Sequence, residues 1–320
     1  GRSAGLGGAR AAMIGGFNGT SNVEAGKRFG IPVLGTMAHS WVMSFDEEID
    51  AFREYVRQYH DNLILLADTY NVLEMGVPHA IQVFKELKEE GRLPGKYGIR
   101  IDSGDIAYLS QEATRMFTEA GFPDAIISGS NDLDEYTIQS LKAQGCTVTS
   151  WGVGTKIITA DGTSALGGVF KMAVKEADGK EVPVMKFSND VEKMTNPGIK
   201  TVYRFYKKDT GKMITDLVCL HDEKAADGGD FTLVTESAKW RRKELKAGTY
   251  TVEELLKPVV ENGRNLPLPA LSEIIRYADK QIDTLWPEYT RLLNPDLMEI
   301  NLSDKLQTLK SELIRRELGE

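Results

Sequence analysis

The chain has 320 residues, of which 41% are hydrophobic, so it can bury a large core in one barrel-sized domain with an appendage. A net charge of -8, from 39 basic and 47 acidic residues, excludes a general electrostatic footprint for nucleic acid or an anionic membrane. The two cysteines, Cys146 and Cys219, exclude a cysteine-rich zinc site, and no apolar run approaches the roughly 20 residues that span a bilayer. We therefore expect a cytoplasmic protein without a membrane-embedded segment or a nucleic-acid partner.

The beginning of the chain, Gly1 to Gly8, has no initiator Met and none of the basic and apolar segments of a signal peptide. We expect the sequence to be the inner part of a longer protein. Helices are predicted over residues 9–14 and 21–29. The second opens on Ser21-Asn22-Val23-Glu24, which has the spacing of a capping box led by Ser21.

Short apolar runs then alternate with helical patterns as far as residue 155. Runs that are apolar throughout indicate strands buried on both faces, and their alternation with helices is typical of βα units around a parallel sheet. The expected strands are 31–36, 62–69, 98–105, 125–130 and 146–155, and the expected helices are 45–60, 78–90, 108–120 and 133–144. Because these strands are too few for an eight-stranded barrel, the others must come from elsewhere, most obviously from missing N-terminal sequence.

The pattern changes after residue 165 to β-branched and aromatic runs. Turn signals at Asp178-Gly179 and Thr210-Gly211 predict hairpins between residues 169 and 220, and helical spacing returns at 271–285 and 303–318. The basic run Lys239 to Lys243 could bind phosphate, although a solvated helix face is the favoured interpretation. We expect three regions: a barrel core over 1–168, β-rich hairpins over 169–240 and C-terminal helices over 241–320.

The segment Arg100-Ile101-Asp102-Ser103-Gly104-Asp105 brings an Arg and two Asp residues to the end of a strand and into a glycine turn. Barrel enzymes keep their active sites at the carboxyl ends of strands, and residues two apart in a strand face the same side. Arg100 and Asp102 could together hold an anionic group and the hydroxyls or metal of a sugar phosphate. The alternative is a buried Arg–Asp pair that closes the strand.

Two glycine-rich segments follow later strands, and they contain Gly129, Ser130 and Asn131 in the first and Gly152, Gly154 and Thr155 in the second. Glycines before a helix let backbone N–H groups approach a phosphate, which the helix N-terminus also attracts. Tight turns are the alternative interpretation of each segment.

Two further strand ends carry polar residues. Thr36 and His39 follow one apolar run, and Asp68 with Thr69 follows the next. A lone His is usually structural or exposed, which is the interpretation for His60, His79 and His221, but its position favours His39 as a site residue. Asp68 could face the same site or serve only as a strand-end cap.

Together these segments resemble the nicotinate phosphoribosyltransferases, members of the type II phosphoribosyltransferases. The resemblance is strongest over residues 1–240 and continues more weakly to the C-terminus. The matching motifs, in order, are GFNGTSNV (16–23), GTMAHS (35–40), RIDSGD (100–105), WGVGT (151–155) and LGGVFK (166–171).

The resemblance implies an α/β fold: an incomplete TIM-like (β/α) barrel with a smaller β-rich domain. It implies that nicotinate and phosphoribosyl pyrophosphate form nicotinate mononucleotide and pyrophosphate in NAD salvage, with Mg²⁺ as cofactor and ATP as co-substrate. His39 would then be the histidine that ATP phosphorylates. Arg100 would pair with the acidic substituent of the pyridine, Asp102 would lie near the ribose hydroxyls and Mg²⁺, and the glycine segments would cradle the 5-phosphate.

One position bears on the choice of pyridine. The nicotinamide-using relative carries an aspartate where this chain has Ser21, and an aspartate would repel a carboxylate, so Ser21 favours nicotinate. The chain lacks the Phe-Gly-x-Arg-Arg motif that the family carries upstream, and we expect it to be inactive by itself. The alternatives are a nicotinamide or quinolinate phosphoribosyltransferase, or an inactive barrel that binds phosphoribosyl compounds. Family members generally act as homodimers, which we also expect here.

Overall fold

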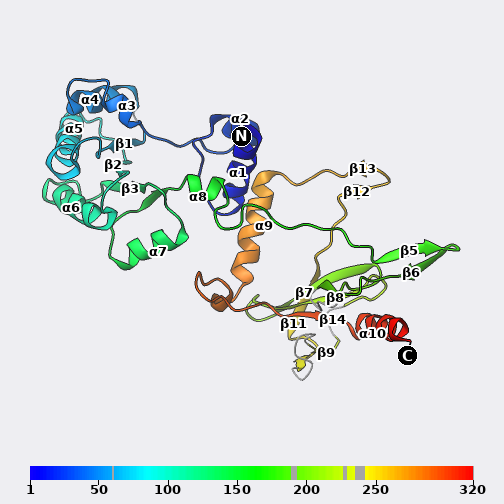
Figure 1. The fold of residues 1–320 in the computed structure, drawn as a ribbon. Helices are drawn as coiled ribbons and strands as arrows, with labels where there is room; N and C mark the ends of the chain where they lie inside the picture. The colour runs from blue at the N-terminus through cyan, green and yellow to red at the C-terminus, as the bar shows by residue number, and fades with distance from the viewer. Residues whose placement is uncertain (60, 189–192, 226–228, 235–241, 320) are drawn as a thin grey trace. The chain divides into compact units, whose positions relative to one another are not determined.

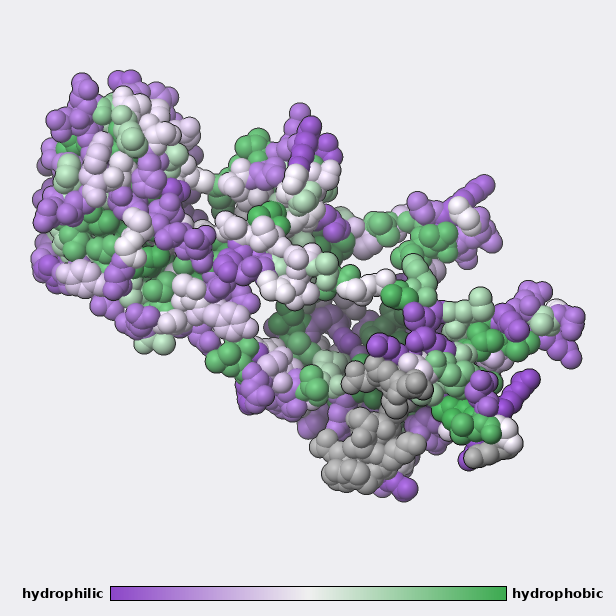
Figure 2. All heavy atoms as spheres, viewed as in Figure 1, coloured by the Kyte–Doolittle hydropathy of each residue, from purple (hydrophilic) through white to green (hydrophobic). Residues whose placement is uncertain are grey.

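The computed structural model of the chain describes all residues except 60, 189–192, 226–228, 235–241 and 320. It divides into two compact units, Gly1–Leu166 and Gly167–Glu320 (Figure 1). Within the described residues no helix is both long enough and apolar enough to cross a membrane. Figure 2 shows hydrophilic residues along much of the outer rim of the first unit, with hydrophobic residues interspersed in both units.

The first unit is built on a sheet of four parallel strands in the order β1-β2-β3-β4, with helices in the connections. The strands are β1 (Leu63–Leu66), β2 (Tyr97–Ile101), β3 (Ile126–Ser130) and β4 (Ser150–Gly152). The helices are α1 (Arg2–Ile14), α2 (Val23–Phe29), α3 (His39–Val42), α4 (Glu48–Gln58), α5 (Val77–Glu89), α6 (Ile106–Glu119), α7 (Glu135–Ala143) and α8 (Thr155–Ile158), and a π-helical turn, η1 (Val72–Gly76), precedes α5. The predicted α/β class with a parallel sheet is confirmed.

The core of this unit explains why the sequences of β1 and β2 are mostly apolar, whereas β3 and β4 are more exposed. All four residues of β1 are buried, so both of its faces are covered. Helix α5 buries Ala80, Val83, Phe84 and Leu87, which recur at the spacing of one helix face. The ring of Phe84 lies 5.0 Å from that of Tyr97 on β2, centroid to centroid, so that helix and sheet bury aromatic surface together.

The first unit differs from the sequence-based expectation in several details, of which one is that α1 begins at Arg2 and not at residue 9. The segment 31–36 is not a regular strand, since among the described residues it makes a single isolated parallel bridge, Thr20 to Val33. Pro32 has no N–H to give to a ladder, and Thr20 bonds the backbone on both sides of Val33. The expectation that Ser21 caps α2 was also wrong: the side chain of Asn22 accepts the hydrogen bond from the Ala25 N–H.

The second unit contains a four-stranded sheet in the order β11-β7-β8-β14, in which β14 runs parallel to β8 and the other pairs are antiparallel. Separate two-stranded pairs are β5 with β6, β9 with β10 and β12 with β13. The strands are β5 (Val174–Ala177), β6 (Lys180–Pro183), β7 (Lys200–Lys207), β8 (Met213–Leu220), β9 (Phe231–Val234), β10 (Arg242–Leu245), β11 (Tyr250–Glu254), β12 (Val260–Glu261), β13 (Arg264–Asn265) and β14 (Ile300–Leu302). Helices α9 (Leu271–Thr284) and α10 (Asp304–Leu318) and a 3-10 turn (Pro287–Tyr289) complete it.

Both predicted hairpins of this unit are confirmed, β5–β6 through Asp178-Gly179 and β7–β8 through the turn at Thr210-Gly211. Asp178 and Gly179 have φ of 53° and 68°, the left-handed conformation that a two-residue hairpin turn requires. The prediction of a helix at the basic run 239–243 was wrong for the two residues of it that the structure describes. Arg242 and Lys243 lie in β10, which pairs with β9. Lys239, Trp240 and Arg241 lie outside the described residues, as does His60.

Candidate functional site

Asp68 follows β1 and connects the carboxyl ends of two neighbouring strands. Its Oδ2 accepts hydrogen bonds from the backbone N–H of Asp102 (3.0 Å) and from the hydroxyl of Ser103 (2.6 Å). The side chain is only 1% exposed, and its Oδ1 is buried without a hydrogen-bond partner among the described residues. A buried polar atom without a partner is costly, and the group nearest to Oδ1 is His39 Nε2, 4.0 Å away, so a small movement of the imidazole would give Oδ1 a donor.

Asp102 extends the same arrangement to the third strand. Its Oδ1 accepts the hydroxyl hydrogen bond of Ser130 at the end of β3, and its side chain is 34% exposed. The residues that follow β1, β2 and β3 therefore converge at one edge of the sheet. Ligands of parallel α/β sheets bind at this carboxyl edge.

His39, the first residue of α3, lies against both carboxylates. Its Nε2 is 3.7 Å from Asp102 Oδ2 and 4.0 Å from Asp68 Oδ1, while its Nδ1 is 3.1 Å from the hydroxyl oxygen of Thr69. The two acidic groups favour the proton on Nε2, which leaves the Nδ1 lone pair to accept from the Thr69 hydroxyl. At 39% exposure the imidazole remains accessible to a ligand.

Arg100 does not pair with Asp102, which overturns the alternative of a buried Arg–Asp pair. No ion pair joins the two side chains in the described part of the chain. Instead, Arg100 Nη1 donates to the hydroxyl of Thr36 (2.6 Å), and its Nε is buried with no hydrogen-bond partner in the residues that the structure describes. A guanidinium with an unsatisfied donor can bind an acidic ligand through its planar fork.

The two glycine segments are neighbours, since Ser130 of β3 pairs with Gly152 of β4. A Cβ on Gly152 would lie 3.2 Å from the Cβ of Ser130, and one on Gly129 would lie 3.2 Å from Val148, so small residues keep this edge accessible. The adjoining Asn131 has φ of 96°. Backbone groups can therefore approach a ligand closely at the ends of β3 and β4.

The nearby helix N-termini contribute less than expected. At the N-terminus of α7 the carboxylate of Asp134 already accepts a hydrogen bond from the Thr137 N–H (2.7 Å). At the N-terminus of α6 the carboxylate of Asp105 likewise accepts from the Tyr108 N–H. Helix α8, which Gly154 and Thr155 begin, has only four residues. Phosphate recognition here would depend on the remaining N–H groups, because carboxylates already cap α6 and α7 and because α8 is short.

The structure leaves some candidates apart from the cluster. Ser21 is exposed at the start of α2, and among the described residues no hydrogen bond links it to the other candidates. Gly104, at φ of 81°, shapes the turn between Asp102 and α6. Thr155 and Asn131 are exposed.

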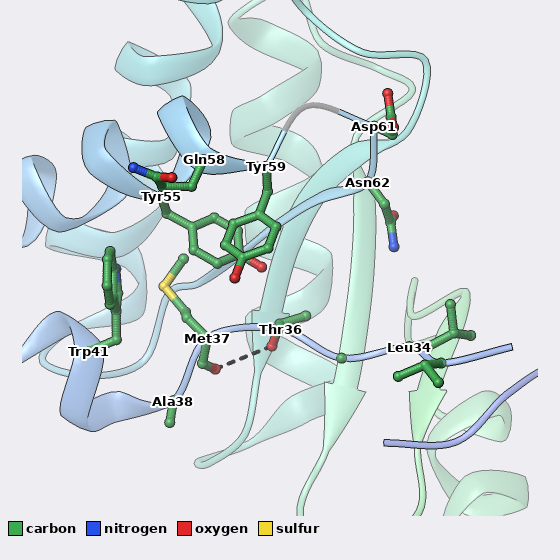
Figure 3. A pocket seen from close by; sticks show the side chains of 12 residues that line it. Leu34, Thr36, Met37, Ala38, Trp41, Tyr55, Gln58, Tyr59, Asp61 and Asn62 are labelled. Atoms are coloured by element: carbon green, nitrogen blue, oxygen red, sulfur yellow. Dashed lines mark hydrogen bonds between the residues drawn. The ribbon is translucent and has the colours of Figure 1, made fainter. Parts of the chain in front are cut away.

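A cleft of about 750 Å³ extends from the amino end of β1, at Asp61 and Asn62, to Thr36, Met37 and Ala38 (Figure 3). The rings of Tyr55 and Tyr59, 4.6 Å apart between centroids, extend from α4 over Met37. Thr36 is the one candidate residue among those that line the cleft. Because Thr36 accepts from Arg100 and Ala38 directly precedes His39, the aromatic cleft adjoins the candidate site.

Sequence reasoning missed the pair Glu48 and His79, whose facing atoms, Oε2 and Nδ1, are 2.7 Å apart behind the site. Glu48 stands in a run of three acidic residues, Asp46 to Glu48, and its neighbours look identical in the sequence. Only the packing buries Glu48, so the sequence carried no signal that could have found the pair.

Two family models match the chain. The model of the nicotinate phosphoribosyltransferase (NAPRTase) family matches residues 2–224, and the model of the nicotinate phosphoribosyltransferase C-terminal domain matches residues 199–310. The chain belongs to the nicotinate phosphoribosyltransferase family. This membership confirms the resemblance that the motifs indicated.

Individual members of the family are similar over nearly the whole chain. The nicotinate phosphoribosyltransferase of Bacillus subtilis (strain 168) is 41% identical over 311 residues, which cover 96% of this chain and 62% of that protein. That of Caenorhabditis elegans is 31% identical over 363 residues, covering 96% and 63%. The chain thus spans about three fifths of the length of these relatives.

Solved structures show the same fold. The crystal structure of human nicotinic acid phosphoribosyltransferase superposes with a TM-score of 0.77 at 28% identity, covering 97% of this chain and 67% of that one. A nicotinate-nucleotide pyrophosphorylase from Pyrococcus furiosus superposes with a TM-score of 0.59 at 21% identity, covering 86% and 61%, and at that identity it supports the fold alone.

Proposed function

We propose that the full-length gene product is a nicotinate phosphoribosyltransferase. It joins nicotinate to phosphoribosyl pyrophosphate, releases pyrophosphate and couples the reaction to ATP hydrolysis through a phosphohistidine at His39. The observation that carries the proposal is the convergence of His39, Asp68, Asp102 and Ser130 at the carboxyl ends of parallel strands, with the guanidinium of Arg100 on the same sheet.

Each polar group has a role that fits this reaction. Arg100, oriented by Thr36, binds the nicotinate carboxylate. The ring nitrogen then attacks the anomeric carbon as the C–O bond to pyrophosphate breaks, and positive charge develops on the sugar. Asp68 and Asp102 accept the ribose hydroxyls and stabilise that charge, while backbone groups at Gly129, Ser130 and Gly152 to Thr155 bind the 5-phosphate.

The acidic groups also fit a magnesium ion. In the described residues no three His, Cys, Asp or Glu side chains are already grouped as a metal site. Mg²⁺ commonly binds through one or two carboxylates together with substrate phosphates, and Asp102 has an exposed oxygen suited to this. The ion would neutralise charge on the pyrophosphate leaving group.

For the coupling step we infer that Nδ1 of His39 is the nucleophile, after the Thr69 hydroxyl that donates to its lone pair has turned to another acceptor. The carboxylates beside Nε2 hold the proton there and stabilise the imidazolium that forms as Nδ1 attacks the terminal phosphorus of ATP and ADP departs. Phosphohistidine adds negative charge beside the pyrophosphate site. Its hydrolysis then drives product formation.

We also propose that Ser21 makes the site selective for nicotinate, because an aspartate at this position would repel the substrate carboxylate. A Ser21→Asp variant should lose efficiency with nicotinate, measured as kcat/KM. An unchanged kcat/KM would remove Ser21 from the site.

At the level of architecture, we infer an incomplete TIM-like barrel completed outside this chain, and a homodimer. In the described residues β1 is an edge strand of its sheet, which supports both inferences, since open sheet edges in proteins are normally paired or covered. Sedimentation of the full-length gene product as a monomer would refute the homodimer.

The deciding experiment measures mononucleotide formation by the full-length gene product with nicotinate, nicotinamide or quinolinate, with and without ATP, beside a His39→Ala variant. We expect nicotinate-selective turnover that ATP stimulates in the parent and not in the variant. Turnover with nicotinamide or quinolinate alone would favour the corresponding phosphoribosyltransferase. Binding of phosphoribosyl pyrophosphate in a calorimeter, without any turnover, would favour an inactive binding barrel.

A further inference from the structure

Glu48 and His79 form a pair beneath the candidate site that none of the proposed steps uses. The Glu48 side chain, at the first residue of α4, is 0% exposed, and its Oε2 lies 2.7 Å from Nδ1 of His79 in the first turn of α5. The imidazole N–H donates to the carboxylate. Burial raises the pKa of the Glu48 carboxyl, and the nearby negative charge of Asp68 acts in the same direction.

The pair joins the two segments that carry the His39 contacts. Helix α4 comes nine positions after His39, which begins α3. On the other side, η1 and α5 follow Asp68 and Thr69 directly. Gly76, the last residue of η1, is so close to the preceding strand end that an added Cβ would lie 2.0 Å from the carbonyl oxygen of Ala67. A movement of the start of α5 would therefore be transmitted to Asp68 and Thr69.

Holding the two helices together does not by itself explain the pair. Arg53 and Glu86 already join α4 to α5 farther along both helices, with a nitrogen–oxygen distance of 2.7 Å and exposed side chains. The pair of Glu48 and His79 is costlier, because Glu48 Oε1 is buried without a hydrogen-bond partner among the described residues. An apolar contact would hold the helices together without that penalty.

We propose that Glu48 and His79 are positioning residues for the phosphorylation of His39: their pair holds the His39 imidazole against Thr69 and beside Asp68. This inference rests on the proposed function. The geometry that it maintains is the 3.1 Å approach of His39 Nδ1 to the Thr69 hydroxyl, which leaves Nε2 facing the two carboxylates.

The test compares three variants of the full-length gene product. Glu48→Gln keeps the shape and removes the charge, and Glu48→Gln combined with His79→Gln keeps a neutral hydrogen bond, so that no buried charge is left alone. Arg53→Gln is the matched control, because it cuts the other link between the same helices. Circular dichroism and thermal melting establish that each variant is folded.

The first measurement is the ratio of nicotinate turnover with ATP to turnover without it. Both Glu48 variants should lose at least about tenfold of the ATP stimulation while ATP-independent turnover is retained, since a displacement of about 1 Å can cost about 100-fold in rate. Arg53→Gln should keep the parent ratio. Stimulation within twofold of the parent in both Glu48 variants would overturn the inference, as would an equal loss in the Arg53 control.

A second measurement separates this inference from the proposed function. Nitrogen NMR of labelled His39 reports which ring nitrogen carries the proton, and it does not depend on turnover. If the parent proves inactive, the proposed function falls. A changed His39 tautomer or chemical shift in both Glu48 variants, and not in Arg53→Gln, would still support the positioning role, and unchanged His39 signals would refute it.

Discussion

Gly98 provides a sharp test of the sheet that carries the site. It lies on β2, two residues before Arg100, and pairs with Ile126 of β3. A Cβ at this position would lie 1.9 Å from the carbonyl oxygen of Ile126 and 2.6 Å from its carbonyl carbon and backbone nitrogen. Because these atoms are backbone, a change of rotamer cannot relieve the contact, and the Gly98→Ala substitution must force β2 and β3 apart.

The size of the effect follows from that displacement. A Cβ needs about 3 Å or more from such atoms, so the strands would have to shift by over 1 Å in a ladder held at a spacing of about 4.8 Å. Overpacking in a core typically costs about 1–3 kcal/mol, and a clash with backbone belongs at the upper end, about 3 kcal/mol. For a unit of this size that corresponds to a melting temperature lower by about 6–12 °C.

Gly95→Ala is the matched control. An added Cβ there meets nothing within 4 Å, in the loop immediately before β2. Differential scanning calorimetry of both variants should show a lower melting temperature for Gly98→Ala and a shift within about 2 °C for Gly95→Ala. A Gly98→Ala protein that melts with the parent would refute the close approach of β2 and β3, and with it the placement of Arg100 beside Ser128.

Three other predictions follow from single contacts. Asn22→Ala should lower the free energy of unfolding by about 1 kcal/mol because it removes the cap of α2, whereas Ser21→Ala should not, as chemical denaturation can show. Burial raises the pKa of the Cys219 thiol from 9.0 to about 11; its reactive thiolate is therefore about 100-fold scarcer at pH 8, and iodoacetamide should label it about 100-fold more slowly in the folded protein than in urea. Equal labelling rates would contradict the burial of Cys219. Arg100→Lys should raise the KM for nicotinate at least about tenfold, because an ammonium lacks the guanidinium fork; an unchanged KM would show that Arg100 does not bind the carboxylate.

Sequence reasoning succeeded where local chemistry decides the structure. The alternation of apolar runs with helical patterns predicted the parallel sheet of β1 to β4. In β1 and β2 the apolar sequence matches nearly complete burial, as expected of strands covered on both faces. The hairpin turn at Asp178-Gly179 was predictable for a similar reason, since few residue types adopt a positive φ there. The family motifs extended this success to the family itself.

Sequence reasoning failed where a nonlocal neighbour decides the outcome. Segment 31–36 has the composition of a strand, but a strand also needs a partner along its whole length, and Thr20 provides only one bridge. The cap of α2 was assigned to Ser21. The helix begins one residue later than that assignment requires, so Asn22 is the N-cap. Both errors concern the position of the backbone in space, which the order of residue types does not specify.

The sequence by itself determined the family, the class of fold and the residue types at the ends of the strands, because motifs, apolar periodicity and turn residues are local properties. Only the tertiary structure decided how those residues meet: Arg100 with Thr36, Asp68 with Asp102 and Ser103, and His39 between two carboxylates. It also decided that Glu48, among three adjacent acids, is the buried one. Burial and hydrogen bonding depend on atoms far apart in the chain, and therefore they become determined only when the strands and helices pack.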